Sequence, residues 1–293
     1  MNISVVIPLY NKADRIYHTV NSVLNQTFKD FELIIIDDGS TDKSIEIVQH
    51  IHDSRIRLIR KENGGPSSAR NCGVREAKFD WIIFLDADDE MICDSLEHFV
   101  ELVSANSNIN MFVSNFFLEK DGKRSLYSYF HKNGIVSDNF RSWFFCTMMP
   151  CQGSTLYRKT ILLENPYSEI LRRYEDAEML FSLMRTQLIY TSKKPVFIYK
   201  LDAATASKGR KNINEDYLGY LNLNNKSLWE RVVLYDLYRQ ALRLYPKQVY
   251  DVYNGTFGDM ELKFMYAGAN MIKFILRKIT RILNLLWASK NNV

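Results

Sequence analysis

Apolar runs and helical apolar spacing alternate along the first 90 residues of the chain. Residues 3–8, 31–36 and 56–59 are short runs rich in β-branched side chains, which indicates strands covered on both faces. Between the first two runs, apolar residues recur every three or four positions from Ile16 to Leu24, which predicts a helix with one buried face. Strands that alternate with helices predict an α/β fold with a parallel sheet and right-handed crossovers.

The most apolar run of the chain ends in a cluster of carboxylates. Trp81 to Leu85 are consecutive apolar residues, and Asp86, Asp88 and Asp89 follow at once. Ligands of α/β proteins bind at the carboxyl edge of the sheet. Because like charges this close repel unless a cation joins them, the carboxylates predict a Mg²⁺ or Mn²⁺ site that holds a phosphate-bearing substrate. The same residues are also compatible with a solvated turn that caps the next helix.

The segments that follow the earlier strands are expected at the same edge of the sheet. Residues 8–11, 37–38 and 64–65 would therefore share one cleft with residues 86–88. No G-x-G-x-x-G follows the first strand, and G-x-x-x-x-G-K-[ST] occurs nowhere in the chain. Phosphates must then be neutralised by a cation and by Arg70, whose guanidinium can bind two phosphate oxygens at once.

Asp38 and Tyr10 are candidates for recognising the base of a nucleotide. Asp38 ends a strand and could accept a hydrogen bond from an N–H of a pyrimidine, while Tyr10 could pack on the face of that base. Each residue has a structural alternative, because Asp38 could cap the next helix and Tyr10 could fill a loop. The binding hypothesis depends on the convergence of all these segments in one cleft.

Composition and charge place the chain among ordinary globular proteins. With 293 residues and 46% hydrophobic content it can bury a large core. The basic excess is C-terminal, since Lys and Arg outnumber Asp and Glu by 14 to 7 from Ser207 onward but number 24 against 27 before it. The four cysteines have no metal-ligand spacing, and the N-terminus lacks a signal-peptide pattern. These features predict the reducing cytoplasm, and no nucleic acid partner is expected.

Four sequence motifs, in this order, resemble family 2 glycosyltransferases with the GT-A fold. They are VVIPLYN at 5–11, SVLNQTF at 22–28, ELIIIDDGSTD at 32–42 and FLDADD at 84–89. The resemblance covers about the first 200 residues and implies a Rossmann-like, mostly parallel sheet flanked by helices. It also implies a nucleotide-sugar donor, usually carrying UDP, and a single displacement that inverts the anomeric centre.

The resemblance implies a role for each residue that matches a family motif at the donor. Asp38 would contact the base, and Pro8 and Tyr10 would line the nucleotide pocket. Arg70 would lie near the nucleotide or its diphosphate. Asp86 would face the ribose or the donor sugar.

The resemblance also implies the ligands of a divalent cation, Mn²⁺ or Mg²⁺. Asp88 would be the direct ligand. The strand predicted at 196–202 resembles the one that closes the family's catalytic domain, where many members have a basic residue followed by a His. Asp202 occupies that His position, and it could ligate the metal but could not donate a hydrogen bond to phosphate. Residues 203–212 suit either a loop over the donor or a solvated linker.

An acidic pair farther along the chain is the candidate for proton transfer. Glu175 and Asp176 precede an apolar helical pattern, and acids at a helix start also interact favourably with its dipole. The pair falls where the family carries its Glu-Asp motif. By that resemblance Asp176 is the general base for the acceptor hydroxyl and Glu175 helps to shape the acceptor site. The Gln-x-x-Arg-Trp signature of processive members is absent, so transfer of single sugars is expected.

The pattern beyond residue 212 is helical. We therefore expect a catalytic domain at 1–212 and a helical region at 213–293. Apolar residues recur on one side of the last predicted helix, 270–289, with basic residues elsewhere on it. The basic residues expected to face an anionic surface are Lys273, Arg277, Lys278 and Arg281. This helix could lie on the inner face of an anionic membrane, dock on the catalytic domain or pair with a second subunit of a homo-oligomer.

These observations favour an inverting, metal-dependent glycosyltransferase of the hexosyl- or N-acetylhexosaminyl-transferase class. It would move one sugar from a UDP-sugar to a saccharide acceptor, lipid-linked and destined for a surface polysaccharide. A catalytically silent sugar-nucleotide-binding or scaffold module on the same fold is the alternative. The joint presence of Asp38, Asp88 and Asp176 disfavours that alternative, because a silent copy has no chemical need for all three. A nucleotidyltransferase would need a Gly-rich, Arg-bearing loop after the first strand, and residues 9–15 do not form one.

Overall fold

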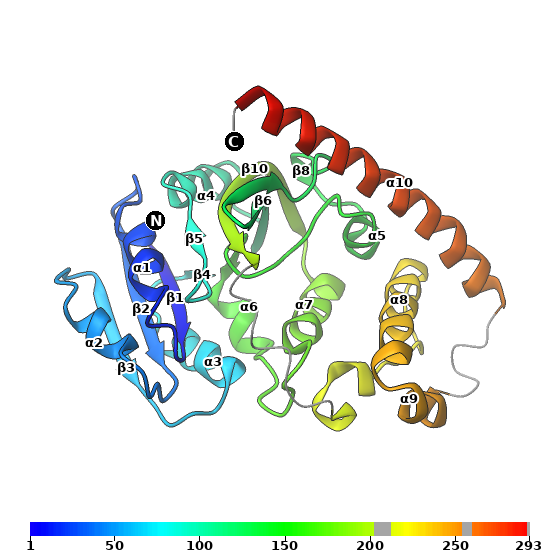
Figure 1. The fold of residues 1–293 in the computed structure, drawn as a ribbon, viewed down its shortest axis with the longest axis horizontal. Helices are drawn as coiled ribbons and strands as arrows, with labels where there is room; N and C mark the ends of the chain where they lie inside the picture. The colour runs from blue at the N-terminus through cyan, green and yellow to red at the C-terminus, as the bar shows by residue number, and fades with distance from the viewer. Residues whose placement is uncertain (202–211, 254–259, 292–293) are drawn as a thin grey trace.

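A single mixed sheet forms the centre of the protein, with helices on both faces (Figure 1). The computed structural model describes residues 1–201, 212–253 and 260–291. The main strand order is β3-β2-β1-β4-β9-β6-β10-β5, with β7 paired to β6 and β8 paired to β10. In chain order the strands are β1 (Ile3–Leu9), β2 (Phe31–Asp37), β3 (Ile56–Arg60), β4 (Trp81–Phe84), β5 (Glu90–Met91), β6 (Met111–Lys120), β7 (Lys123–Leu126), β8 (Gly134–Ile135), β9 (Thr155–Arg158) and β10 (Ile189–Lys200).

The helices connect these strands and then continue the chain beyond β10. The helices between strands are α1 (Ile16–Leu24), α2 (Ser44–Gln49), α3 (Pro66–Glu76), α4 (Ser95–Ala105), α5 (Asn139–Phe144), α6 (Lys159–Glu164) and α7 (Glu175–Thr186). Those after β10 are α8 (Leu228–Leu244), α9 (Pro246–Tyr253) and α10 (Met260–Asn291). Pro246 ends the packing run before it and opens α9, because proline fits the first turn of a helix but not its interior.

The N-terminal half of the sheet is parallel, as its alternating pattern predicts. Strand β1 pairs in parallel with β2 and β4, and β2 pairs in parallel with β3. All seven residues of β2 are buried, which explains its continuous apolar run. The parallel arrangement carries the ends of β1, β2 and β4 to one edge of the sheet.

The other half of the sheet is mixed, and the sequence pattern did not reveal it. Strand β9 lies antiparallel between β4 and β6, while β10 is parallel to β6. Strands β6 and β7 form a hairpin across residues 121–122, where Gly122 has a φ of 72°. The prediction of an α/β fold is confirmed, with a sheet that combines parallel and antiparallel pairs.

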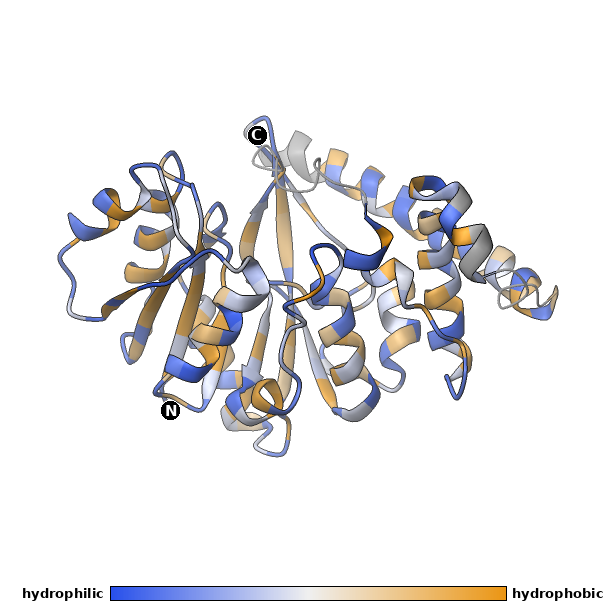
Figure 2. Cartoon of the chain, turned by 90° about the horizontal axis from the view of Figure 1, so that it is seen from below, coloured by the Kyte–Doolittle hydropathy of each residue, from blue (hydrophilic) through white to orange (hydrophobic). Residues whose placement is uncertain are grey.

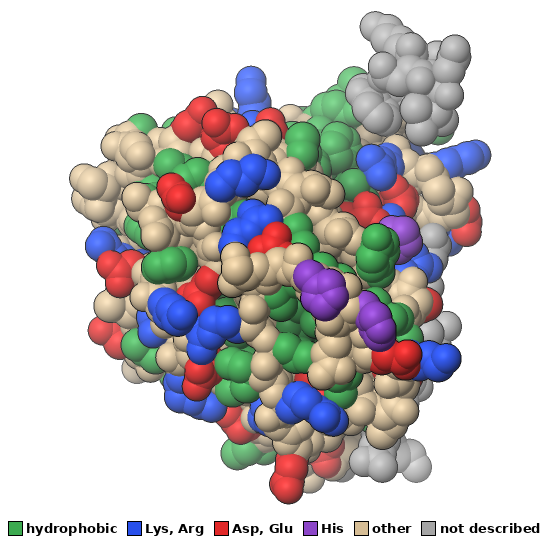
Figure 3. Space-filling model, turned by 90° about the vertical axis from the view of Figure 1, so that its left-hand side faces the viewer, with side chains coloured by type: hydrophobic (Ala, Val, Ile, Leu, Met, Phe, Trp, Pro, Cys, Tyr) green, Lys and Arg blue, Asp and Glu red, His purple; other side chains and the backbone are tan. Residues whose placement is uncertain are grey.

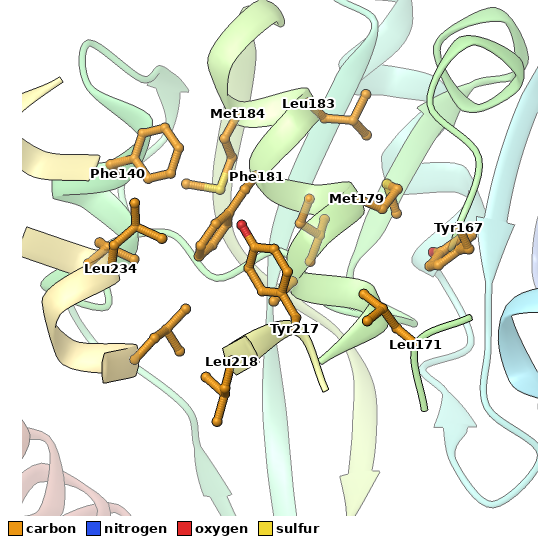
Figure 4. Packing of buried hydrophobic residues seen from close by; sticks show 14 of the residues in the cluster. Phe140, Tyr167, Leu171, Met179, Phe181, Leu183, Met184, Tyr217, Leu218 and Leu234 are labelled. Carbon is orange, nitrogen blue, oxygen red and sulfur yellow. The ribbon is translucent and has the colours of Figure 1, made fainter. Parts of the chain in front are cut away.

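Two hydrophobic clusters cover the two faces of the sheet (Figure 2). One cluster packs the β1 side chains Val5 and Ile7 against α1 and α4. The other extends from Val6 through α7 to α8 and α10, and Figure 4 shows Phe140, Phe181 and Leu234 meeting within it. Helix α8 therefore belongs to the same core as the sheet. The boundary at residue 212 stays a prediction.

Helix α10 is longer than expected, and the side of it that packs on the protein includes a basic residue that was expected to be exposed. It begins ten residues before Asn270 and crosses the upper right of the molecule in Figure 1. Lys273, expected to face an anionic surface, is instead buried, with its ammonium 3.1 Å from an Asp236 carboxylate oxygen. That prediction was wrong, because helical spacing does not reveal a partner 37 residues away. None of the described helices combines the length and apolar composition needed to cross a bilayer.

Candidate active site

The ends of β1, β2 and β4 open into a cleft of about 520 Å³ at the carboxyl edge of the sheet. The four segments expected to converge all contribute to its walls, and α7 and the end of β10 complete them. The lining residues are Pro8, Leu9, Tyr10, Lys12, Asp38, Asn63, Gly65, Pro66, Ala69, Arg70, Asp86, Ala87, Asp88, Asp89, Glu175, Tyr199 and Lys200.

Asp38 organises the floor of the cleft through its buried carboxylate. Its Oδ1 accepts hydrogen bonds from Lys61 Nζ at 2.6 Å and from the Gly64 amide at 3.0 Å. Its Oδ2 accepts one from the Gly65 amide at 2.7 Å. Gly65 has a φ of 87°, a conformation that glycine adopts most readily. Asp38 therefore fixes the turn before α3 and does not cap α2.

The loop after β1 is held against the loop after β2. Asn11, with a φ of 50°, accepts hydrogen bonds from the Thr41 and Asp42 amides through its side-chain oxygen. This bracing leaves the neighbouring Tyr10 with 48% of its surface exposed while it lines the cleft. The ring is thus available to pack on a flat ligand.

The acidic rim after β4 meets two cations of the protein. Arg70 on α3 is buried, and its Nη2 donates to Asp86 Oδ1 at 2.9 Å. On the opposite side of the rim, Lys12 Nζ lies 2.5 Å from Asp88 Oδ2. Arg70 Nε and Nη1 have no hydrogen-bond partner within the described part of the chain. The guanidinium therefore retains donors for a ligand oxygen.

Asp89 is the most deeply buried carboxylate of the rim. Its Oδ1 accepts a hydrogen bond from the Lys200 amide at 2.9 Å, which ties the rim to the end of β10. Its Oδ2 is buried and lacks a hydrogen-bond partner among the residues that the structure describes. Burial, reinforced by the nearby Asp86, raises the pKa of Asp89 well above its usual range. Asp89 is therefore a structural support of the rim.

The acidic pair opens α7 on the far wall of the cleft. Tyr174, just before it, has a φ of 54° and directs the chain sharply into the helix. Glu175 lines the cleft, and its Oε1 lies 3.6 Å from Arg70 Nη1. Asp176 is half-buried, and its Oδ1 accepts a hydrogen bond from the Ala177 amide at 2.8 Å. Burial raises the pKa of both carboxyls, which makes their ionised forms stronger bases.

The structure therefore brings most of the predicted site residues together. Asp176 is adjacent to the lining residue Glu175 but does not itself line the cleft, and Asp202 lies outside the described residues. The residues found in the cleft walls are Pro8, Tyr10, Asp38, Arg70, Asp86, Asp88 and Glu175. Sequence reasoning missed Lys12, Tyr199 and Lys200. Lys12 carried a local signal, since it lies close behind Tyr10 and bears a charge opposite to that of the acidic rim.

The donor set suits a cation that also binds ligand phosphates. Within the described ranges, no three His, Cys, Asp or Glu residues are grouped as a metal site. Mg²⁺ commonly takes only one or two carboxylates from the protein and completes its shell with phosphate oxygens and water. Asp88 fits that pattern, because its carboxylate lies at the cleft surface and already attracts the Lys12 ammonium. The carboxylate rim is therefore compatible with Mn²⁺ or Mg²⁺.

Comparison with known proteins agrees with this arrangement. An "Uncharacterized glycosyltransferase" of Rickettsia felis is 35% identical over 62% of this chain, but the chain covers only 30% of that relative. The "GalNAc(5)-diNAcBac-PP-undecaprenol beta-1,3-glucosyltransferase" of Campylobacter jejuni is 29% identical, over 75% of this chain and 72% of its own length.

Solved structures show the same fold. S. aureus TarS 1-349 in complex with UDP-GlcNAc superposes with a TM-score of 0.67 and 18% identity, over 92% of this chain and 79% of that one. The mannosyltransferase PcManGT from Pyrobaculum calidifontis, in complex with GDP-Man and Mn2+, has a TM-score of 0.53 and 14% identity, over 99% of this chain and 86% of that one. These neighbours confirm the GT-A fold. The model of the family described as "Glycosyl transferase family 2" matches residues 4–164, more than half of the chain, and the protein therefore belongs to that family.

Proposed function

We propose that this chain is an inverting glycosyltransferase that moves one sugar from a UDP-sugar to a lipid-linked saccharide. The observation that carries the proposal is the cleft, which combines the fixed turn at Asp38, the free donors of Arg70, the acidic rim and the start of α7. All of its lining residues fall between Pro8 and Lys200, so we assign catalysis to residues 1–212.

The base of the nucleotide would bind over the β1 and β2 ends. Tyr10 would pack on one face of the base, and Pro8 would contribute to the wall. The Asp38 carboxylate already accepts three hydrogen bonds, which leaves capacity for about one more because a carboxylate offers roughly four lone-pair sites. An N–H of uracil would satisfy that remaining site.

Transfer would take place between the rim and α7. The acceptor hydroxyl attacks the anomeric carbon from the side opposite the diphosphate, the new C–O bond forms, and the bond to the diphosphate oxygen breaks with its electron pair. The Asp176 carboxylate takes the hydroxyl proton, and its raised pKa suits this role. Glu175 shapes the acceptor side, and Arg70 donates to the departing diphosphate while Asp86 faces the ribose or sugar.

Asp88 would hold Mn²⁺ or Mg²⁺, with Asp202 as the further ligand suggested by the family resemblance. When bound, the cation supplies positive charge that stabilises the departing diphosphate. Lys12 would be released from Asp88 when the cation binds, and its ammonium would then be available to a phosphate oxygen.

The Campylobacter jejuni relative is named for an undecaprenol-diphosphate acceptor, which supports a lipid-linked saccharide as substrate here. Such an acceptor would place this enzyme at the cytoplasmic face of a membrane, without a spanning helix among the described residues.

A panel of nucleotide sugars tests the proposal directly. Release of UDP should require one sugar donor, a saccharide-diphosphate lipid acceptor and Mn²⁺ or Mg²⁺, and a chelator should abolish it. Asp88→Asn should behave like the chelator, whereas the matched change Asp30→Asn, at an exposed site outside the cleft, should leave turnover unchanged. Donor binding without any metal-dependent release would instead identify a silent binding module.

A further inference from the structure

Helix α10 attaches to the protein through both polar and apolar residues of its inner side. Asn284 donates from Nδ2 to the Leu126 carbonyl and accepts from the Leu126 amide, both at 2.9 Å, so it extends the edge of the β6–β7 hairpin. Lys273 pairs with Asp236 and lies 4.3 Å from the centre of the Phe144 ring. The side of this helix that carries Lys273 and Asn284 therefore faces the core, together with the buried apolar residues Leu262 and Ala269.

The opposite side of α10 presents large apolar side chains to solvent. No described segment covers them, and Phe264 and Leu285 are exposed by 71% and 67%. Contiguous exposed apolar surface of this kind usually marks an interaction site. The outer face consists of Phe264, Met271, Phe274, Ile275, Ile282 and Leu285.

Basic side chains border this outer face along one flank. Arg277 and Arg281 lie on α10, and Lys120 and Lys123 come from the β6–β7 hairpin across a hollow of about 600 Å³. None of these four forms an ion pair with another described residue, and no Asp or Glu lines the hollow within the described part of the chain. By contrast, basic and acidic side chains are interspersed on the face formed around α2 (Figure 3). The border of α10 is therefore mainly basic, with Asp121 in the hairpin turn as an acidic residue between Lys120 and Lys123.

We infer that the outer face of α10 and its basic border form a docking surface for an anionic lipid bilayer. The apolar side chains enter the boundary between headgroups and acyl chains, and the Arg and Lys side chains contact lipid phosphates. A second copy of the chain is a poorer occupant, because it would bring another Arg277 and Arg281 border of the same mainly positive charge.

The docking surface is joined to the donor cleft through one carboxylate. Glu119 on β6 accepts from Lys200, a lining residue of the cleft, at 2.9 Å. The same carboxylate accepts from Arg124, which lines the basic hollow, at 2.6 Å. A bilayer seated on α10 would thus contact a region that is linked by ion pairs to the cleft that the proposed function assigns to a lipid-linked acceptor. This inference deepens that proposal, but docking does not require sugar transfer.

Sedimentation of the full chain with vesicles tests the inference. We expect binding to phosphatidylglycerol-containing vesicles, weak binding to phosphatidylcholine vesicles, and release by high salt. The pair Arg277→Gln and Arg281→Gln should lower partitioning about 30-fold, since each charge near an anionic surface contributes about fivefold. The pair Phe274→Ser and Ile282→Ser should lower it about tenfold or more. The matched pair Lys29→Gln and Lys78→Gln, at exposed sites on the sheet domain, should change it little.

Other results would overturn the inference. One is equal binding to neutral and anionic vesicles. Another is an equal loss of vesicle binding in the α10 pair, Arg277→Gln with Arg281→Gln, and in the control pair of lysine substitutions. A third is a stable dimer in the absence of lipid that Phe274→Ser and Ile282→Ser dissociate, which would assign the face to a second copy. Circular dichroism of each variant shows whether it is folded. Release of UDP by the parent chain is measured separately. A parent chain that releases UDP but does not bind vesicles refutes docking alone, and one that binds vesicles but does not release UDP refutes the proposed chemistry alone.

Discussion

The donor cleft and helix α10 use amphipathic sequence in opposite ways. At the cleft, apolar strands are buried and the polar residues that follow them are delivered to an open edge. In α10, polar Asn284 and Lys273 are turned toward the protein beside a few apolar residues such as Leu262, and most of the large apolar side chains that the structure describes face outward. The difference shows that hydrophobic patterning identifies the two faces of an element, but only its partners decide which face is buried.

The largest expected effect concerns catalysis at the cleft and does not involve α10. Asp176→Asn should lower the turnover number by about two to four orders of magnitude with donor affinity nearly unchanged, because a positioned base contributes that much. In the parent protein, turnover should fall with acid through the raised pKa of Asp176, since the protonated carboxyl cannot accept a proton.

Steady-state kinetics and donor titrations measure both effects. Glu178→Gln, in the same helical turn but outside the cleft walls, is the matched control and should retain turnover. If Asp176→Asn abolished donor binding instead, the residue would belong to the donor pocket and Glu175 would become the candidate base.

The next largest effect is the loss of stability at low pH, and it concerns β10, the strand that runs between the two regions. Buried His98 and His131 both contact Ser192 of β10, and burial lowers the pKa of each to about 4 from 6.5. The unfolded chain therefore binds protons that the folded chain rejects as pH falls from about 6.5 toward 4. The free energy of unfolding should fall over that window by up to about 3 kcal/mol for His131, and by less for His98, whose charge is better screened by solvent.

Urea unfolding at several pH values measures this loss. His98→Gln can keep a hydrogen bond to Ser192 and should flatten the dependence between pH 6.5 and 4. His52→Gln, at an exposed position, should not. An unchanged slope in His98→Gln would show that other groups control acid stability.

A smaller effect is expected from a substitution that weakens the attachment of α10 and leaves the cleft unchanged. Asn284→Ala leaves the Leu126 amide and carbonyl without their partner, at a cost of about 1–3 kcal/mol. Hydrogen exchange in α10 and the β6–β7 hairpin should accelerate by roughly tenfold. Exposed Asn270→Ala on the same helix is the control. Protection that stays unchanged in Asn284→Ala would mean that other contacts hold the helix in place.

The smallest effect concerns the exposed ring at the cleft entrance. Tyr10→Ala should raise the Michaelis constant for the donor about fivefold, the value of roughly 1 kcal/mol of base packing. Tyr17, also exposed but outside the cleft walls, supplies the control Tyr17→Ala. Equal donor constants in the parent and Tyr10→Ala would assign the ring to the loop rather than to the nucleotide.

The sequence was sufficient for the parallel half of the sheet and for the residues at its strand ends. Tyr10, Asp38 and Asp88 reach one cleft because parallel strands terminate at a common edge, so local pattern and topology decide their position. Lys200 was missed because it arrives from β10, whose place depends on β6 and on pairing between distant segments. No alternation marked the antiparallel pairs of β9 with β4 and β6, which place β6 and therefore β10 in the sheet.

The orientation of α10 was also beyond sequence reasoning. Helical spacing predicted an apolar stripe, but the burial of Lys273 depends on Asp236, and the attachment of Asn284 depends on the edge of the β6–β7 hairpin. Both partners come from distant parts of the chain, so neither is visible in helical periodicity.

The hydrogen bond between Tyr174 and Gln240 limits how this family member can be recombined. Tyr174 precedes the acidic pair on α7, and its hydroxyl donates to Gln240 on α8 at 3.1 Å. A chimera that exchanges everything after residue 212 would therefore alter the support of the catalytic wall together with the tail. An exchange that begins at Met260 would retain α8 and α9 and replace only α10. The support of the catalytic wall by α8 is thus retained only when α7 and α8 stay together.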